Sequence, residues 1–73
     1  MKVQSIIRVA VGQYEVRVFT EQRETLGITD IEIAVHREQD LSMMQLAEKL
    51  LENKTILAVE IIGWDRNGVR VER

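Results

Sequence analysis

One stretch of the sequence constrains the fold more than any other, because it is apolar on both faces of the strand that it is expected to form. This stretch is Thr55–Trp64, which reads TILAVEIIGW. The chain shows only one amphipathic helix, and one helix covers one face of a sheet. The second face therefore needs another cover, and in a regular strand it carries Ile56, Ala58, Ile62 and Trp64, with Glu60 among them.

The length and composition predict one small domain that has few means of support besides its core. The 73 residues, taken as a single domain over 1–73, contain no cysteine and no Cys/His set for a structural zinc. Oligomerisation is the remaining common support for a core of this size. The lack of cysteine fits a reducing compartment. The first residues lack the apolar core of a signal peptide, and no stretch approaches the ~20 apolar residues of a membrane span, so we expect a soluble cytoplasmic protein.

Two strands joined by a two-residue loop are predicted at the start of the chain. Residues 3–11 and 14–20 alternate in hydropathy on either side of Gly12-Gln13, and glycine at the first loop position is typical of a type II′ hairpin turn. This turn sets a register in which one face of the ribbon is almost wholly apolar. The predicted pairs on that face are Val11 with Tyr14, Val9 with Val16, Ile7 with Val18, and Ser5 with Thr20. The reverse face pairs Ala10 with Glu15, Arg8 with Arg17, and Ile6 with Phe19.

The middle of the chain predicts a third strand and then the helix. Residues Ile31–Val35 alternate strictly in hydropathy, which is typical of a strand. The period changes over Asp40–Asn53, where the apolar residues fall on one side of a helix: Met43, Met44, Leu46, Ala47, Leu50 and Leu51. Ser42 with Gln45 forms a capping box at its start, although Asp40 is an alternative cap.

A second hairpin is predicted at the end of the chain. Asn67-Gly68 separates Thr55–Trp64 from the alternating residues 69–73, and Asn-Gly is a strong hairpin signal. With a loop of two or four residues, Val69 and Val71 share a face with Ile62 and Trp64. The predicted fold is α+β, of order β-β-β-α-β-β, with a mainly antiparallel sheet and the helix packed on one face.

The surplus apolar face is the candidate binding surface. Its predicted partner-binding residues are Ile6, Phe19, Ile62, Trp64 and Val71, which include the only tryptophan and the only phenylalanine of the chain. Aromatic residues are enriched in interface cores. Three alternatives remain open: the sheet curls or the helix sits on this face, two copies form a homodimer, or another protein docks there.

Arginines on the reverse face of the first hairpin and near the C-terminus form a second candidate site. Arg8 faces Arg17, and Arg66 and Arg70 lie in the last hairpin, so an anion or a nucleic acid could bind there. Nearby carboxylates, such as Glu15 and Glu21 beside the first pair, provide the simpler neutralisation. The ten Lys and Arg against twelve Asp and Glu give a net charge of −2, so bulk attraction to phosphate is not expected.

The sequence predicts neither a metal site nor a catalytic centre. His36 is the only histidine, and at ~3.3 Å per residue a strand places it about 13 Å from Glu32, too far to share an ion. There is no cysteine nucleophile, glycine-rich phosphate loop or metalloprotease motif, and we expect no cofactor. We therefore expect a non-enzymatic interaction module, either a homodimer or an accessory or inhibitor protein of the kind borne by phages and mobile elements, with a nucleic-acid-binding or nucleotide-binding module as the alternative.

Overall fold

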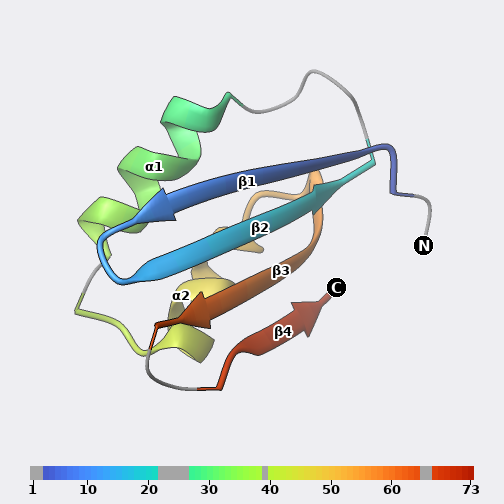
Figure 1. The fold of residues 1–73 in the computed structure, drawn as a ribbon. Helices are drawn as coiled ribbons and strands as arrows, with labels where there is room; N and C mark the ends of the chain where they lie inside the picture. The colour runs from blue at the N-terminus through green and yellow to red at the C-terminus, as the bar shows by residue number, and fades with distance from the viewer. Residues whose placement is uncertain (1–2, 22–26, 39, 65–66) are drawn as a thin grey trace.

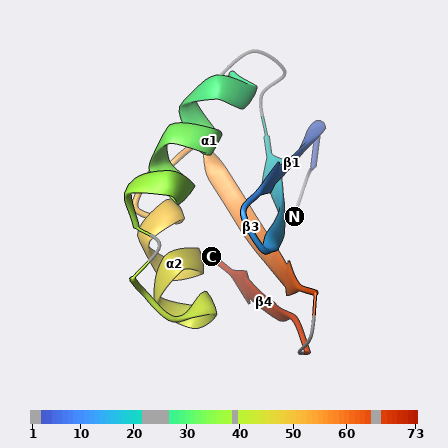
Figure 2. The same cartoon turned by 60° about the vertical axis from the view of Figure 1, so that its left-hand side comes forward.

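Two helices lie on one face of a four-stranded antiparallel sheet, in the order β-β-α-α-β-β (Figure 1). The computed structural model describes residues 3–21, 27–38, 40–64 and 67–73. The strands follow one another across the sheet in chain order, β1-β2-β3-β4. Figure 2 shows both helices in one layer, with the sheet as the other layer. The α+β class, the antiparallel sheet and the helix cover on a single face confirm the fold predicted from the sequence.

The first hairpin has the predicted register at every pair. β1 spans Ser5–Val11 and β2 spans Tyr14–Thr20, with Val11 opposite Tyr14 and Arg8 opposite Arg17. Gly12 has a φ of 58°, whereas no described residue other than glycine has a positive φ. Only the first loop residue is thus left-handed, as a type II′ turn requires.

The strand predicted at Ile31–Val35 is wrong, because these residues belong to the helix α1, Ile28–Arg37. Ile31 and Val35 are both buried, and because they lie four residues apart, they fit one side of a helix as well as one face of a strand. Ile33 stays 46% exposed. The Asp30 carboxylate accepts a hydrogen bond from the Gly27 N–H at 3.3 Å, which satisfies one donor at the helix start.

The second helix, α2, spans Met43–Leu50 and begins as predicted. The Ser42 hydroxyl accepts from the Gln45 N–H at 3.2 Å, and the Gln45 side chain accepts from the Ser42 N–H at 3.1 Å. Met43, Leu46 and Leu50 point into the core, but Met44 is 45% exposed rather than part of the buried stripe.

A β-bulge in β3, Ile56–Gly63, changes which of its residues face the helices. Phe19 pairs with Ala58 whereas Thr20 pairs with Ile56, so Leu57 is an extra residue in β3. The extra residue turns Ile56 onto the helix side, where it is 2% exposed. The prediction that Ile56 shares a face with Ile62 and Trp64 is therefore wrong.

The last strand, β4, Val69–Glu72, also has the opposite parity to the one predicted. Ile61 pairs with Val69 and Val59 pairs with Val71, which leaves an odd number of residues in the connection instead of two or four. Val69 and Val71 consequently pack against the core beneath α2, and they do not share a face with Trp64.

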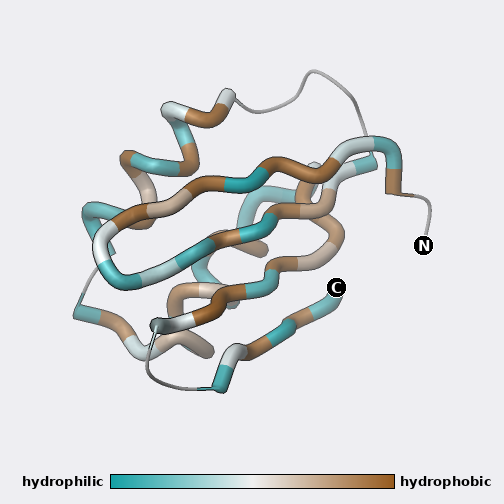
Figure 3. The backbone as a smooth tube through the Cα atoms, in the orientation of Figure 1, coloured by the Kyte–Doolittle hydropathy of each residue, from teal (hydrophilic) through white to brown (hydrophobic). Residues whose placement is uncertain are grey.

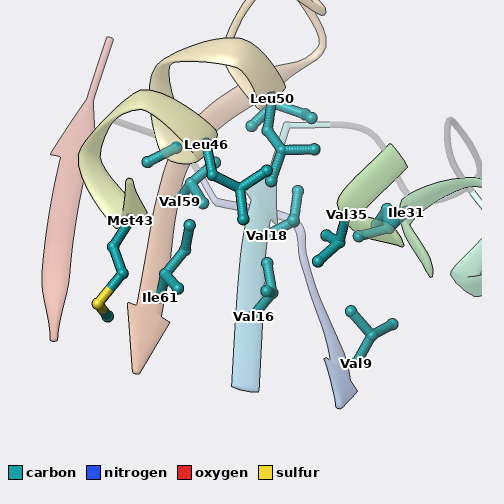
Figure 4. Close-up of a cluster of buried hydrophobic side chains, with 12 residues drawn as sticks. Val9, Val16, Val18, Ile31, Val35, Met43, Leu46, Leu50, Val59 and Ile61 are labelled. Carbon is teal, nitrogen blue, oxygen red and sulfur yellow. The ribbon is translucent and has the colours of Figure 1, made fainter. Parts of the chain in front are cut away.

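The hydrophobic core lies between the sheet and the two helices (Figure 4). Hydrophobic and charged residues alternate along β4, whereas β3 is apolar on both faces apart from Glu60 (Figure 3). The fully buried core side chains of largest volume are Leu46, Ile56, Ile61, Val16, Val18, Val35 and Val59. Both helices bury their apolar sides here, so neither of them covers the outer side of the sheet.

Candidate functional site

The sheet face opposite the helices, here called the open face, carries three rows of side chains that cross the strands. The first row is Ile6, Phe19, Ala58 and Glu72; the central row is Arg8, Arg17, Glu60 and Arg70; and the third is Ala10, Glu15 and Ile62. The register of the four strands therefore brings three of the five predicted partner-binding residues, Ile6, Phe19 and Ile62, onto the same face as three of the four predicted arginines. The fourth arginine, Arg66, lies outside the described residues.

Glu60 lies between two arginines of the central row and holds both of them. Its carboxylate is 2.8 Å from Arg70 Nη1 and 3.7 Å from Arg17 Nη1. Arg17 also contacts Glu15 at 2.7 Å, and Arg70 contacts Glu72 at 2.8 Å. Hydrogen bonds with Glu72 and then with Glu60 raise the pKa of Arg70 above its usual value. Each of the two arginines thus has two carboxylate neighbours, and neither is free to neutralise a bound phosphate.

Phe19 is partly covered by the same network. The Arg70 guanidinium lies over its ring, 4.8 Å from the ring centre, which is the geometry of a cation–π interaction. The ring is half-buried between its neighbours in the first row. Phe19 therefore packs within the open face and is a less accessible anchor than the sequence predicts.

Arg8 differs from the other arginines of the central row. It is exposed on β1, directly opposite Arg17, and within the described part of the chain no carboxylate pairs with it. The predicted neutralisation of both arginines by Glu15 and Glu21 holds for Arg17 with Glu15 only. Among the arginines that the structure describes on this face, Arg8 is the one that an incoming anionic group can pair with.

The exposed apolar residues lie at the two ends of the open face, separated by the charged central row. Ile6 is 47% exposed at one end, whereas Ile62 is 38% exposed and Trp64 is 80% exposed at the end of β3. A shallow hollow of about 250 Å³ adjoins Ile62 and is lined by Arg17, Glu60, Ile62, Gly68, Val69 and Arg70. The exposure of Ile62 and Trp64 contradicts the alternative in which the sheet curls around them or a helix covers them. Val71, by contrast, packs on the helix side.

A second feature, an open groove of about 720 Å³, lies between the last residues of β1 and the outer side of α1. It is lined by Ala10, Val11, Gly12, Thr29, Glu32, Ile33, His36 and Arg37. Glu32 and His36 are one helical turn apart and both line the groove, so the 13 Å separation expected for a strand is wrong. Two possible ligands remain too few, since no three metal-binding side chains gather among the described residues. A helix predicted over residues 28–37 would have placed Glu32 and His36 one turn apart beside Ile33, and all three line the groove.

Neither a protein-family model, nor a curated protein, nor a solved structure matches the chain. The candidate site therefore depends on the geometry described above. Within the described segments, no helix has the length and apolar character needed to cross a lipid bilayer.

Proposed function

We propose that this protein is a non-enzymatic interaction module that binds a protein partner through the open face, with Trp64 and Ile62 as its apolar anchors. The partner in this proposal is a second copy of the chain, because two-fold dimers are by far the commonest closed assemblies. The lack of cysteine in the sequence supports a reducing, cytoplasmic setting.

The observation that carries the proposal is the exposure of Trp64, the only tryptophan of the chain. Trp64 is 80% exposed and directly follows β3, two residues after the partly exposed Ile62 of the open face. A tryptophan buries ~150–250 Å² when it is covered, and because Trp64 is 80% exposed, burying this exposed share at about 25 cal/mol per Å² would contribute roughly 3–5 kcal/mol before the cost of association. Tryptophan is also enriched among the residues that dominate interface energies.

The charges of the open face are compatible with self-association. Its described residues carry equal numbers of arginines and glutamates: Arg8, Arg17, Arg70, Glu15, Glu60 and Glu72. Two such faces therefore meet without a net repulsion. The same balance weighs against the nucleic-acid alternative, because phosphate binding depends on unpaired cations and weakens as salt rises.

Sedimentation velocity from low micromolar to submillimolar concentration tests the proposal. We expect a dimer whose formation reduces acrylamide quenching of the single tryptophan, since association would cover Trp64. The variant W64Q should remain monomeric, whereas the matched control M44Q, which changes an exposed apolar residue on the helix side, should still dimerise. A particle that stays monomeric throughout, with unchanged quenching, would contradict the proposal.

A further inference from the structure

The two edges of the sheet are protected to very different degrees. β4 is short, its Arg70 and Glu72 form an ion pair, and Arg73 continues its pairing by donating from its backbone N–H to the Leu57 carbonyl. β1 is a regular strand of seven residues without proline or bulge, and Arg8 is its only charged residue. Natural proteins protect edges by short strands, charges and bulges, so β1 is the edge left open for pairing.

The backbone of β1 has unpaired groups along this edge. In a two-residue hairpin the closing residues, Val11 and Tyr14, form a hydrogen-bonded pair, and such pairs alternate along an antiparallel ribbon. Ile6, Arg8 and Ala10 therefore direct their N–H and C=O groups away from β2. In the described part of the chain β1 pairs with β2 alone, which leaves these groups available to another strand.

Helix α1 packs against β1 and lies beside the last part of its free edge (Figure 1). The groove between them opens at Val11 and Gly12 and extends to Ile33, which is 46% exposed. Successive side chains of an added strand point to opposite faces, so every second one would enter the space between β1 and α1. Apolar side chains suit this position, because Val9 and Val11 form the adjoining core side of β1.

Arg8 determines the chemistry of the strand that can be added. It lies in the middle of β1, with Arg17 on one side and no carboxylate partner among the described residues. If two copies paired through β1 in the antiparallel register that matches all seven residues, Arg8 would face the Arg8 of the other copy. Like charges directly opposite are destabilising, whereas an acidic residue there would continue the alternation of charge across the sheet.

We propose that the free edge of β1 binds an extended segment of a different protein by strand addition. The segment has an acidic residue opposite Arg8 and apolar residues at the alternate positions that face α1. This inference goes beyond the proposed function, because it uses the edge of the sheet and the groove beside α1 rather than the open face around Trp64.

A short synthetic peptide tests the proposal directly. The probe is the blocked heptapeptide Ile-Thr-Val-Glu-Val-Thr-Ser, whose central Glu faces Arg8 when the peptide runs antiparallel to β1. We expect it to shift the NMR signals of the Ile6, Arg8 and Ala10 amides and to slow their hydrogen exchange. N-methylation of the second, fourth and sixth residues should abolish binding, because those amides face β1. N-methylation of the third and fifth residues is the matched control, because those amides face solvent.

A charge exchange supplies an independent test of the register. Replacing the central Glu of the peptide by Lys should weaken binding roughly two- to tenfold, as expected for a cross-strand pair that changes from opposite to like charge. The variant R8E should bind the Lys peptide better than the Glu peptide. No binding at millimolar peptide, shifts confined to the surroundings of Trp64, or equal effects of both N-methylation patterns would overturn the proposal. The W64Q variant should bind the peptide normally, so this test is separate from that of the dimer.

Discussion

Two isoleucines on the same strand provide a matched test of the β-bulge in β3. A regular strand would place Ile56 and Ile62 on one face, but the bulge buries Ile56 to 2% exposure and leaves Ile62 38% exposed. The variants I56A and I62A remove the same three carbon atoms from the same strand. Any difference between them in the free energy of unfolding therefore reports burial rather than strand propensity.

The structure gives the size of the expected difference. Three carbons at ~0.8 kcal/mol each contribute roughly 2.4 kcal/mol of transfer free energy, and the cavity left at Ile56 raises the loss to about 3–4 kcal/mol. Ile62 is only partly covered and leaves no closed cavity, so its loss should be about 1–1.5 kcal/mol. For a domain with a stability of ~4–11 kcal/mol, I56A would remove a large share of the total.

Urea unfolding followed by circular dichroism measures both losses. We expect the m-values to stay equal and the midpoints to separate. In thermal unfolding, I56A should lower Tm by roughly 12–32 °C, since 1 kcal/mol corresponds to ~4–8 °C in a domain of this size. If the two variants lose the same stability within ~0.5 kcal/mol, or if I62A loses more, the bulge and the burial derived from it are refuted.

Two further variants test contacts near the last strand. At Gly68 an added Cβ would lie 2.8 Å from the Ile61 carbonyl oxygen, so G68A should destabilise the protein by about 1–3 kcal/mol. At Gly27 an added Cβ would lie 3.4 Å from the Asp30 carboxylate, so G27A should cost less than about 1 kcal/mol, which is the loss expected for alanine in place of glycine at the N-cap of α1. A neutral G68A in urea unfolding would contradict the close approach at Gly68. The Arg73 side chain donates to backbone carbonyls after α2 and at the start of β3, including a 3.0 Å hydrogen bond to the Ile56 carbonyl. R73A should therefore lower the free energy of unfolding by about 1–2 kcal/mol in the same assay. A loss no larger than that of the exposed control K54A would show that these hydrogen bonds contribute nothing to stability.

The sequence predicted the elements whose signals lie close together along the chain. The register of β1 with β2 was correct at every pair, because a two-residue turn fixes the register of the strands beside it. The cap of α2 was correct because Ser42 and Gln45 are local partners. The sequence also predicted part of the open face. Ile6, Ile62 and Trp64 are exposed, and Arg8 and Arg17 share a row with Glu60.

The predictions were wrong where the hydropathy pattern was compatible with both a helix and a strand, or where a residue's face depended on another part of the chain. Ile31, Ile33 and Val35 fit a strand by alternation, but Ile31 and Val35 also fit one side of a helix, and packing against β1 selects the helix. The groove beside α1 was missed for the same reason. Val71 was assigned to the wrong face because the number of residues in its connection sets the parity of the whole strand.

The sequence by itself thus determined the α+β class, the first hairpin, the start of α2 and the surplus of apolar residues over what one helix can cover. Only the tertiary structure decided which residues form that surplus. The bulge at Leu57 and the odd-length connection before β4 move Ile56 and Val71 into the core, and a second helix is added on the same side of the sheet. The reason is physical: a shift of one residue reverses every side chain of a strand, and non-local packing selects among registers that the local sequence allows equally.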